Sequence, residues 1–267
     1  MDTNLDRDKS VLPVGAVPNH VAYHEVIHNV TRLVADHAAG DDLPVPACPG
    51  WTVRDLVGHL VGICSFAVGR LPAWAEAERS SADMDVRGLL DAWARMGEQA
   101  ESLLAAQSGR RGNIMVMDAF THELDLRYAL GIAPPDDHPA FALAFEILLS
   151  GFSSEVAAHN LPAVLVSVGG REWQAGIGEP VATLSGQPYD IYRSLAGRRT
   201  PEQIARLGWS RDSHRWLPAF TWGPFTPPAE PVEYPVVHVL VPDQTRRQAA
   251  RPVPWPRRPG APEDGPR

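Results

Sequence analysis

The chain has 267 residues, which allows one large domain or two smaller ones with a sizeable core. Its formal net charge of −8 argues against nucleic acid and anionic membranes as partners, because both attract basic surfaces. No apolar run approaches the roughly 18 residues of a membrane span, and the polar segment 1–10 lacks the apolar core of a signal peptide. Cys48 and Cys64 are too few for a disulfide framework, so we expect buried thiols in a reducing cytoplasm.

Almost every segment before about residue 160 has the apolar period of an amphipathic helix. The expected helices, in chain order, are 21–39, 53–68, 85–106, 114–130 and 140–158. The second has the strongest start signal, because Thr52 as N-cap and Asp55 three residues later can form a capping box. Gly131 is a natural end for the fourth. Long amphipathic helices with mostly short loops indicate an up-down helical bundle over residues 18–160, after a flexible segment 1–17.

Beyond residue 160 the pattern changes to short strands. Strands at 163–168 and 171–175 flank Gly169-Gly170, a good two-residue hairpin turn, and a third strand is expected at 181–184. Helices are expected at 188–196 and directly after Thr200. The fold class is therefore a helical bundle followed by a small α+β domain, residues 161–226. A proline- and arginine-rich tail, 227–267, is expected to be largely disordered, with one candidate strand at 236–241.

The helix 114–130 is apolar nearly all round and should be buried, yet one of its faces is polar. Asp118, His122 and Asp125 stack on that face, because residues three, four and seven apart lie in line on a helix. Buried acids and imidazoles are costly unless they are paired or bound to a metal ion. Asp118 and His122 can reach one cation, and His59 from the capped helix can complete a set of three. Three ligands with a position left open are typical of a catalytic divalent site.

A structural interpretation of the same residues stays open. An acid four residues before a histidine occurs three times, at Asp55/His59, Asp118/His122 and Glu155/His159. The spacing alone is therefore weak, and a core histidine held by a carboxylate would show it too. Asp125 could equally pair with Arg127 or a backbone amide. His20, His24 and His28 recur every four residues and are better explained as a polar helix face than as a second metal site.

Two segments carry a more specific signal. They read CPGWTVRDLVGHL at 48–60 and DAFTHELDLRYA at 118–129. Both resemble the mycothiol-dependent maleylpyruvate isomerase family, whose N-terminal domain is a DinB-like metal-binding four-helix bundle. Segments 182–198 and 207–212 are similar to the second domain of that family. The resemblance covers about residues 20–215 in order, and it is much less specific for one reaction than for the family.

The resemblance implies a divalent ion, most simply zinc, held by His59, Asp118 and His122, with Asp125 orienting an imidazole. The best-known members of the family have glutamate where Asp118 stands, so the ion should lie nearer this helix or bind more weakly. The resemblance also implies mycothiol as the thiol cofactor, because a coordinating metal converts a thiol into the nucleophilic thiolate. Arg198 is the candidate for binding a substrate carboxylate. A surface arginine at a helix C-terminus explains the same position.

Two reactions on a small electrophile are consistent with this chemistry. An isomerase adds the thiolate to a conjugated cis double bond, allows rotation and expels the thiolate, whereas an S-transferase leaves the thiol on its product. The leading hypothesis is therefore a cytoplasmic mycothiol-dependent isomerase or S-transferase, monomeric or homodimeric. The alternative is a non-catalytic small-ligand binding or sensor protein that retains the metal, or a member without metal. The sequence does not predict the substrate, because the candidate pocket wall at 70–84 has no recognisable motif.

Overall fold

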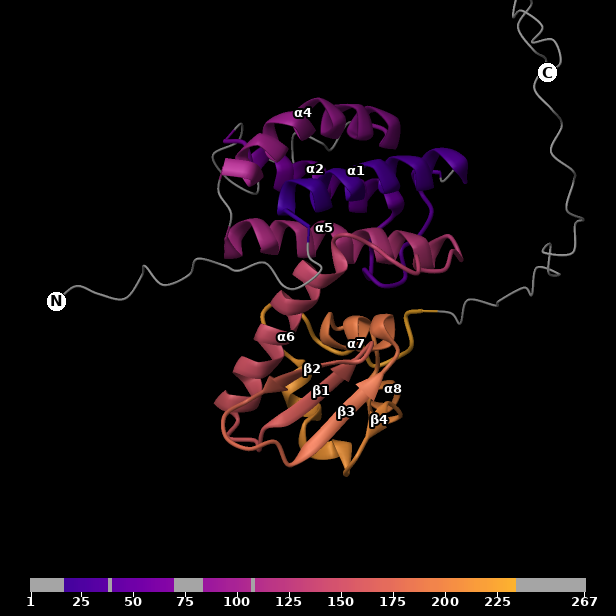
Figure 1. Ribbon diagram of the computed structural model, residues 1–267. Coiled ribbons are helices and arrows are strands. Elements are labelled where there is room, and N and C mark those ends of the chain that lie inside the picture. The colour runs from indigo at the N-terminus through magenta and orange to yellow at the C-terminus, as the bar shows by residue number, and fades with distance from the viewer. Residues whose placement is uncertain (1–16, 38–39, 70–83, 107–108, 234–267) are drawn as a thin grey trace, which may run out of the picture. The chain divides into compact units, whose positions relative to one another are not determined.

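The computed structural model describes residues 17–37, 40–69, 84–106 and 109–233. The first part of the chain is helical, as Figure 1 shows. The helices are α1 (Asn19–Asp36), α2 (Val53–Ala67), α4 (Val86–Ala106), α5 (Arg110–Ala129) and α6 (Phe141–Ala158). All five predicted helices are confirmed, with α1 and α5 beginning a few residues earlier than expected. Several predictions concern residues outside the described ones. They are the flexible N-terminal segment up to residue 16, the candidate pocket wall at 70–83, and the tail from residue 234 onward with its candidate strand at 236–241.

The start of α2 is built as its sequence predicts. The Thr52 side chain accepts a hydrogen bond from the Asp55 backbone N–H at 3.3 Å, and Asp55 Oδ2 accepts one from the Thr52 N–H at 2.9 Å. Two of the N–H groups that a helix start leaves unpaired are thereby satisfied. Arg54 extends the anchorage, because its Nε donates to the backbone oxygen of Met84 at 2.8 Å. The entry to α2 is therefore fixed in both position and direction.

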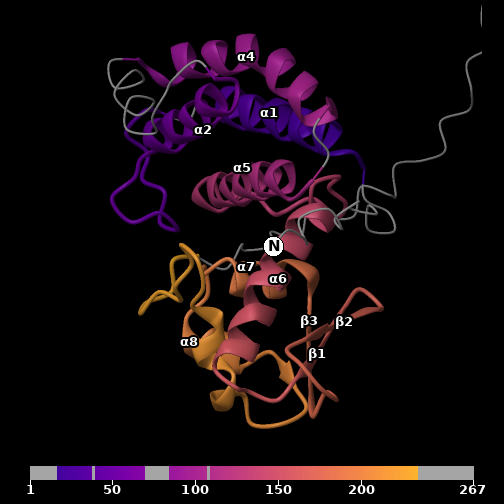
Figure 2. The same cartoon turned by 90° about the vertical axis from the view of Figure 1, so that its left-hand side faces the viewer.

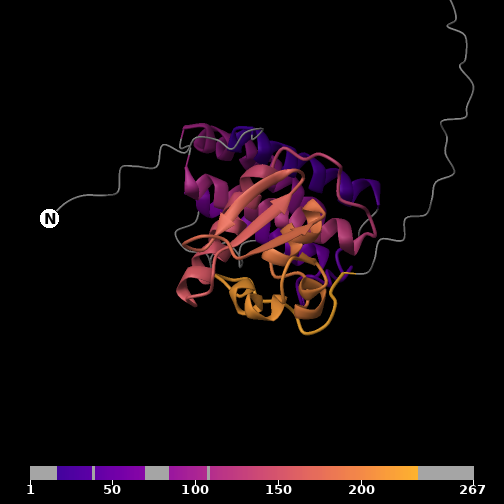
Figure 3. The ribbon, with the colours of Figure 1, turned by 60° about the horizontal axis from the view of Figure 1, so that its bottom comes forward.

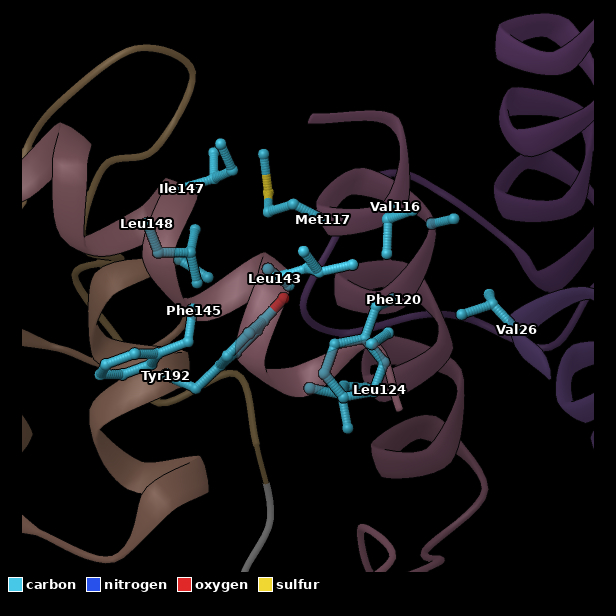
Figure 4. Packing of buried hydrophobic residues seen from close by; sticks show 14 of the residues in the cluster. Val26, Val116, Met117, Phe120, Leu124, Leu143, Phe145, Ile147, Leu148 and Tyr192 are labelled. Atoms are coloured by element: carbon cyan, nitrogen blue, oxygen red, sulfur yellow. The ribbon is translucent and has the colours of Figure 1, made fainter. Parts of the chain in front are cut away.

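Helix α5 is the centre of the helical region. It packs against α1 on one side and α6 on the other, while α2 and α4 pack together above it (Figure 2). Its polar residues are consequently enclosed, and the continuous stretch from Ala119 to Leu126 is buried. Figure 4 shows Leu143 of α6 meeting Phe120 and Leu124 of α5, with Tyr192 beside them. The burial of α5 that its composition predicts is confirmed.

Helix α6 differs from expectation in one respect. By length and composition it could cross a membrane, with a mean hydropathy of 1.4 over 18 residues, although no such span was expected. Half of it is buried against other elements of the fold, among them α5, α7 (Pro188–Leu195) and a strand. The core helix of a globular protein has the same composition, and we interpret α6 in this way.

The second part of the chain forms a four-stranded mixed sheet in the order β2-β1-β3-β4 (Figure 3). The strands are β1 (Val164–Val168), β2 (Arg171–Ala175), β3 (Ala182–Gly186) and β4 (Gly208–Trp209). β1 pairs antiparallel with β2 and parallel with β3. The turn between β1 and β2 uses Gly169 and Gly170 at φ 57° and 76°, a left-handed conformation that glycine adopts without strain. The predicted hairpin is confirmed, whereas β4, with two residues, is too short to recognise.

Two short helices accompany the sheet, and the first of them, α7, contacts both β3 and α6. They are α7 and α8 (Pro201–Ala205), and α8 begins with a second capping box, formed by Thr200 and Gln203 as predicted. Two 3-10 turns follow, at Ser213–Arg215 and Leu217–Phe220. The predicted fold class, a helical region followed by a small α+β region, is confirmed. All described residues belong to one compact unit, and the predicted domain boundary near residue 160 stays a prediction.

Candidate metal centre and adjoining cavity

Helices α2 and α5 bring the three predicted ligands together. His59 lies in the second turn of α2, and its Nε2 is 3.3 Å from Asp118 Oδ2 on α5. His122 Nε2, one turn further along α5, is 3.8 Å from Asp118 Oδ1. One donor atom from each residue lies within 4.8 Å of the other two. Two ligands of a tetrahedral ion with bonds of about 2.1 Å are about 3.4 Å apart. This donor set therefore fits one divalent ion after small side-chain rotations.

Two neighbours orient the imidazole of His122. Its Nδ1 lies 3.0 Å from Asp125 Oδ2, so an Nδ1–H that donates to this carboxylate leaves the Nε2 lone pair facing Asp118. The indole of Trp51 stacks on the same ring, with centroids 5.6 Å apart and planes at 28°. Trp51 also packs against His59 at 5.0 Å. The tryptophan before the α2 cap thus supports both histidines, a role that the sequence did not predict.

The charge of Asp118 also suits a cation. Burial raises the pKa of the Asp118 carboxyl, but the hydrogen bond with His59 and the neighbouring His122 outweigh that effect and lower the pKa below its usual value. The carboxyl is therefore ionised at neutral pH. Although aspartate is shorter than glutamate, both of its oxygens lie within 3.4 Å of His59 Nε2.

Asp125 is the centre of a buried ionic network. Its side chain is fully buried, and Oδ1 accepts a hydrogen bond from Arg193 Nη1 at 2.6 Å while Oδ2 accepts one from Arg198 Nη2 at 2.9 Å. Arg193, also fully buried, donates through Nε to Glu233 as well. Burial raises the pKa of Asp125, but the two guanidinium groups prevail and hold the pKa well below its usual range. Asp125 is thus a permanent carboxylate that links His122 to the second part of the chain.

Asp125 does not pair with Arg127, the alternative that the sequence left open. Arg127 instead donates to Glu123, one turn earlier on α5, with Nε 2.8 Å from Oε1. Glu123 is itself fully buried and lies 3.1 Å from His138 Nε2. This second cluster was not predicted, because His138 comes from the loop before α6 and only the tertiary fold brings it to α5.

Arg198 lies beside the donor set but is not a surface arginine. It follows Gly197, which has φ 65° and ends α7, and only 12% of its side chain is exposed. Nε and Nη2 both donate to Asp125, at 3.2 and 2.9 Å, and Nη1 donates to the Ala196 oxygen at 3.0 Å. Burial lowers the pKa of Arg198, but Asp125 prevails and raises it. The guanidinium also borders a cavity, so an N–H group that these contacts leave unused can meet a ligand there.

Cys48 is a member of this cluster that the sequence did not assign to the site. Its sulfur lies 3.3 Å from Asp125 Oδ2 and 3.7 Å from His122 Nδ1, and these three residues form a second candidate donor group. Arg198 Nη2 is 3.8 Å from the sulfur, which disfavours a cation there. Burial and the charge of Asp125 raise the pKa of the Cys48 thiol, so it stays neutral. Both cysteines are free and buried, as predicted.

The other histidine patterns have no part in this site. His24 on α1 pairs with Glu101 at 2.9 Å, and His28 is exposed. Among the described residues, neither candidate donor group includes a histidine of α1. Glu155 and His159, which have the same spacing, form a partly exposed pair at 3.5 Å.

A cavity of about 1200 Å³ adjoins the donor set. Its walls come from the loop before α2, from α2, α4 and α5, and from the segment around residues 222–225. The residues that line it are Ala47, Cys48, Pro49, Trp51, His59, Ile63, Phe66, Ala67, Ala100, Leu103, Leu104, Gly109, Arg110, Arg111, Gly112, Ile114, Met115, Met117, Asp118, His122, Ile147, Arg198, Trp222, Pro224 and Phe225. Most of these side chains are apolar, and the polar ones lie at the donor set except for Arg110 and Arg111 in the first turn of α5. A cavity of this kind suits a small-molecule ligand.

Fold and site together define a helical protein with a candidate metal centre, followed by a small α+β region. Residues 23–112 match the family model described as the mycothiol maleylpyruvate isomerase N-terminal domain. This match covers about a third of the chain, and over that segment it confirms the resemblance noted in the sequence.

The fold is shared with solved structures. The crystal structure of a mycothiol-dependent maleylpyruvate isomerase is similar with a TM-score of 0.51 and 14% identity, covering 73% of this chain and 92% of that one. A histidine-to-alanine mutant of that isomerase gives a TM-score of 0.50 at the same identity and coverage. No curated protein matches the sequence. At this identity the likeness shows the fold alone.

Proposed function

We propose that this protein is a metal- and mycothiol-dependent enzyme that activates a low-molecular-weight thiol for cis-trans isomerisation or S-transfer on a small electrophile. The observation that carries the proposal is the convergence of His59, Asp118 and His122, with donor atoms within 4.8 Å, beside a large cavity. The family match of residues 23–112 supports mycothiol as the thiol. A divalent ion held by these residues would supply the positive charge that lowers the pKa of a bound thiol.

The chain's own residues then have separate tasks. Asp125 and Trp51 hold the imidazole of His122 so that Nε2 stays available as a ligand atom. Arg198, fixed by Asp125 at the edge of the cavity, is placed to bind a carboxylate of the substrate. The apolar walls lower the local dielectric constant, which strengthens each electrostatic interaction in the cavity. Two free cysteines support a reducing cytoplasm as the site of action.

Metal analysis of the purified full-length chain tests the first half of the proposal. Wild type should take up one zinc ion, and His59→Ala and His122→Ala should each lower the zinc affinity at least tenfold, because each removes one of three ligands. His24→Ala, an exposed histidine of α1 paired with Glu101, is the matched control and should bind zinc like wild type. Equal zinc affinity in all four proteins would refute the assignment.

Mass spectrometry of the products tests the second half. The zinc-loaded protein is incubated with mycothiol and an electrophile such as maleylpyruvate. An S-transferase gives a product heavier by the thiol, whereas an isomerase changes the substrate and leaves no adduct. Stabilisation by zinc and mycothiol without any turnover would instead favour the binding or sensor protein.

A further inference from the structure

Along α2, the wall of the cavity changes from polar at the donor set to apolar further along the helix. His59 belongs to the donor set, and the same face of the helix continues through Ile63 to Phe66 and Ala67, at spacings of four, seven and eight residues. A helix rises 1.5 Å per residue, so Phe66 lies about 10 Å along the helix axis from His59. The wall over this distance is apolar throughout.

Helix α5 lines the cavity in the same way, but there the residue numbers fall with distance from the donor set. From Asp118 the cavity continues through Met115 toward Arg111 and Arg110 in the first turn of the helix. The axial distance from Asp118 to Arg111 is again about 10 Å. Leu103 and Leu104 of α4 add a third apolar wall. The cavity is therefore a channel with a polar end at the donor set and apolar sides about 10 Å long.

The far end of this channel exposes apolar side chains to solvent. Phe66 is 52% exposed and Ile114 is 40% exposed, and both line the cavity. Exposed apolar surface that adjoins a cavity is typical of a ligand-binding site, because the free energy of hydrating it is recovered on binding. Two charged side chains lie at this end, Arg110 and Arg111, and both are exposed. Apart from them, Asp118 and Arg198 are the only Asp, Glu, Lys or Arg residues among the described residues that line the cavity.

We propose that the electrophile is an amphipathic molecule with an apolar body about 10 Å long and a terminal carboxylate. Its reactive carbon lies beside the donor set, where Arg198 meets the carbonyl or carboxylate oxygen next to that carbon. Its body lies along Ile63, Phe66 and Met115, and its terminal carboxylate, at the other end, meets Arg110 and Arg111. This inference rests on the proposed function and names the substrate class of that site. A small dicarboxylate bound beside the donor set would not extend along these apolar walls to Arg110 and Arg111.

Binding of unreactive carboxylates tests the proposal without catalysis. Butanoate, hexanoate, octanoate and decanoate are titrated into the full-length chain by calorimetry, first without metal and then with zinc. The affinity should rise about two- to fourfold per added methylene, fourfold being the gain for complete burial of the methylene. Maleate should bind at least tenfold more weakly than decanoate. No rise with chain length, or tighter binding of maleate, would overturn the proposal.

Paired variants show where the chain binds. Ala67→Trp fills the channel from an exposed position at the end of α2, and should lower the decanoate affinity at least tenfold. Ala94→Trp places the same side chain at an exposed position of α4 away from the cavity, and should bind decanoate like wild type. Equal effects of the two variants would show that decanoate does not enter the channel, and would overturn the proposal.

The carboxylate is tested separately. Decanoate should bind wild type at least tenfold more tightly than decanol. The double variant Arg110→Gln with Arg111→Gln should abolish that difference in affinity. The control Arg87→Gln, exposed on α4, should preserve it. An unchanged ratio in the double variant would overturn the role of the two arginines. Because these titrations need neither metal nor thiol, their failure is distinguishable from failure of the proposed function. A chain that takes up zinc and turns over mycothiol, but binds all acids alike, refutes the substrate class alone.

Discussion

Replacement of Asp125 by asparagine is the sharpest test of the buried network. The variant keeps the shape of the side chain but loses the charge that faces Arg193 at 2.6 Å and Arg198 at 2.9 Å. Arg193 is fully buried, so its charge would retain only Glu233 as an acidic partner. Breaking a buried ion pair by removing one partner costs about 3–5 kcal/mol. Since a domain is stable by about 5–15 kcal/mol, the variant should lose at least about a fifth of its stability.

Urea denaturation at pH 7 measures this loss. Glu155→Gln is the matched control, because it removes one carboxylate from a partly exposed pair with His159 and should cost less than about 1 kcal/mol. The zinc affinity of Asp125→Asn should also fall about 10- to 100-fold, as expected when the partner of a ligating histidine is removed. A free energy of unfolding within about 1 kcal/mol of wild type would refute the interpretation of the network.

The difference in unfolding free energy between wild type and Asp125→Asn should depend on pH. The pKa of Asp125 lies well below its usual value in the folded state and near 3.9 in the unfolded chain. The stability that its charge contributes is therefore fully present above about pH 4, and is lost as the pH falls toward the lowered folded-state pKa. The gap in unfolding free energy between wild type and Asp125→Asn should stay constant from pH 7 to about pH 5, and should narrow below about pH 4. A gap that widens in acid would contradict this assignment.

Two further substitutions test local features of the fold. Thr52→Ala removes the cap of α2 and should lower the unfolding free energy by about 1 kcal/mol. The control Ser102→Ala, at an exposed position of α4, should change it by less than half as much. Equal losses of the two variants in urea denaturation would contradict the role of the cap. Gly151→Ala would place its Cβ 2.1 Å from the ring of Trp222, so the indole, which lines the cavity, must move. We expect a loss of about 1–3 kcal/mol and a shift in tryptophan fluorescence, and an unchanged spectrum together with unchanged stability would show that the close contact is absent.

Two parts of the molecule follow from short-range information in the chain. The capping box of Thr52 and Asp55 and the hairpin at Gly169-Gly170 depend on residues within a few positions of each other. Apolar periodicity located the helices for the same reason, since each residue's partners on a helix face lie three or four positions away. This is why the spacing of Asp118 and His122 was enough to place them on one face of α5. That His59 from the capped helix could complete the set was only one of the open interpretations, and the resemblance to the family favoured it.

The surroundings of these residues depended on the tertiary structure alone. Arg193 and Arg198 reach Asp125 from 68 and 73 positions along the chain, and Cys48 reaches it from 77. Nothing local in the sequence pairs such residues, because a buried ion pair is selected by whichever segments the packing brings together. The channel beside the donor set has the same origin, since its apolar walls come from three helices, α2, α4 and α5, whose separate sequences do not indicate a shared cavity. Local hydrogen bonding and periodicity determined the elements, and long-range packing decided their partners and the shape of the space between them.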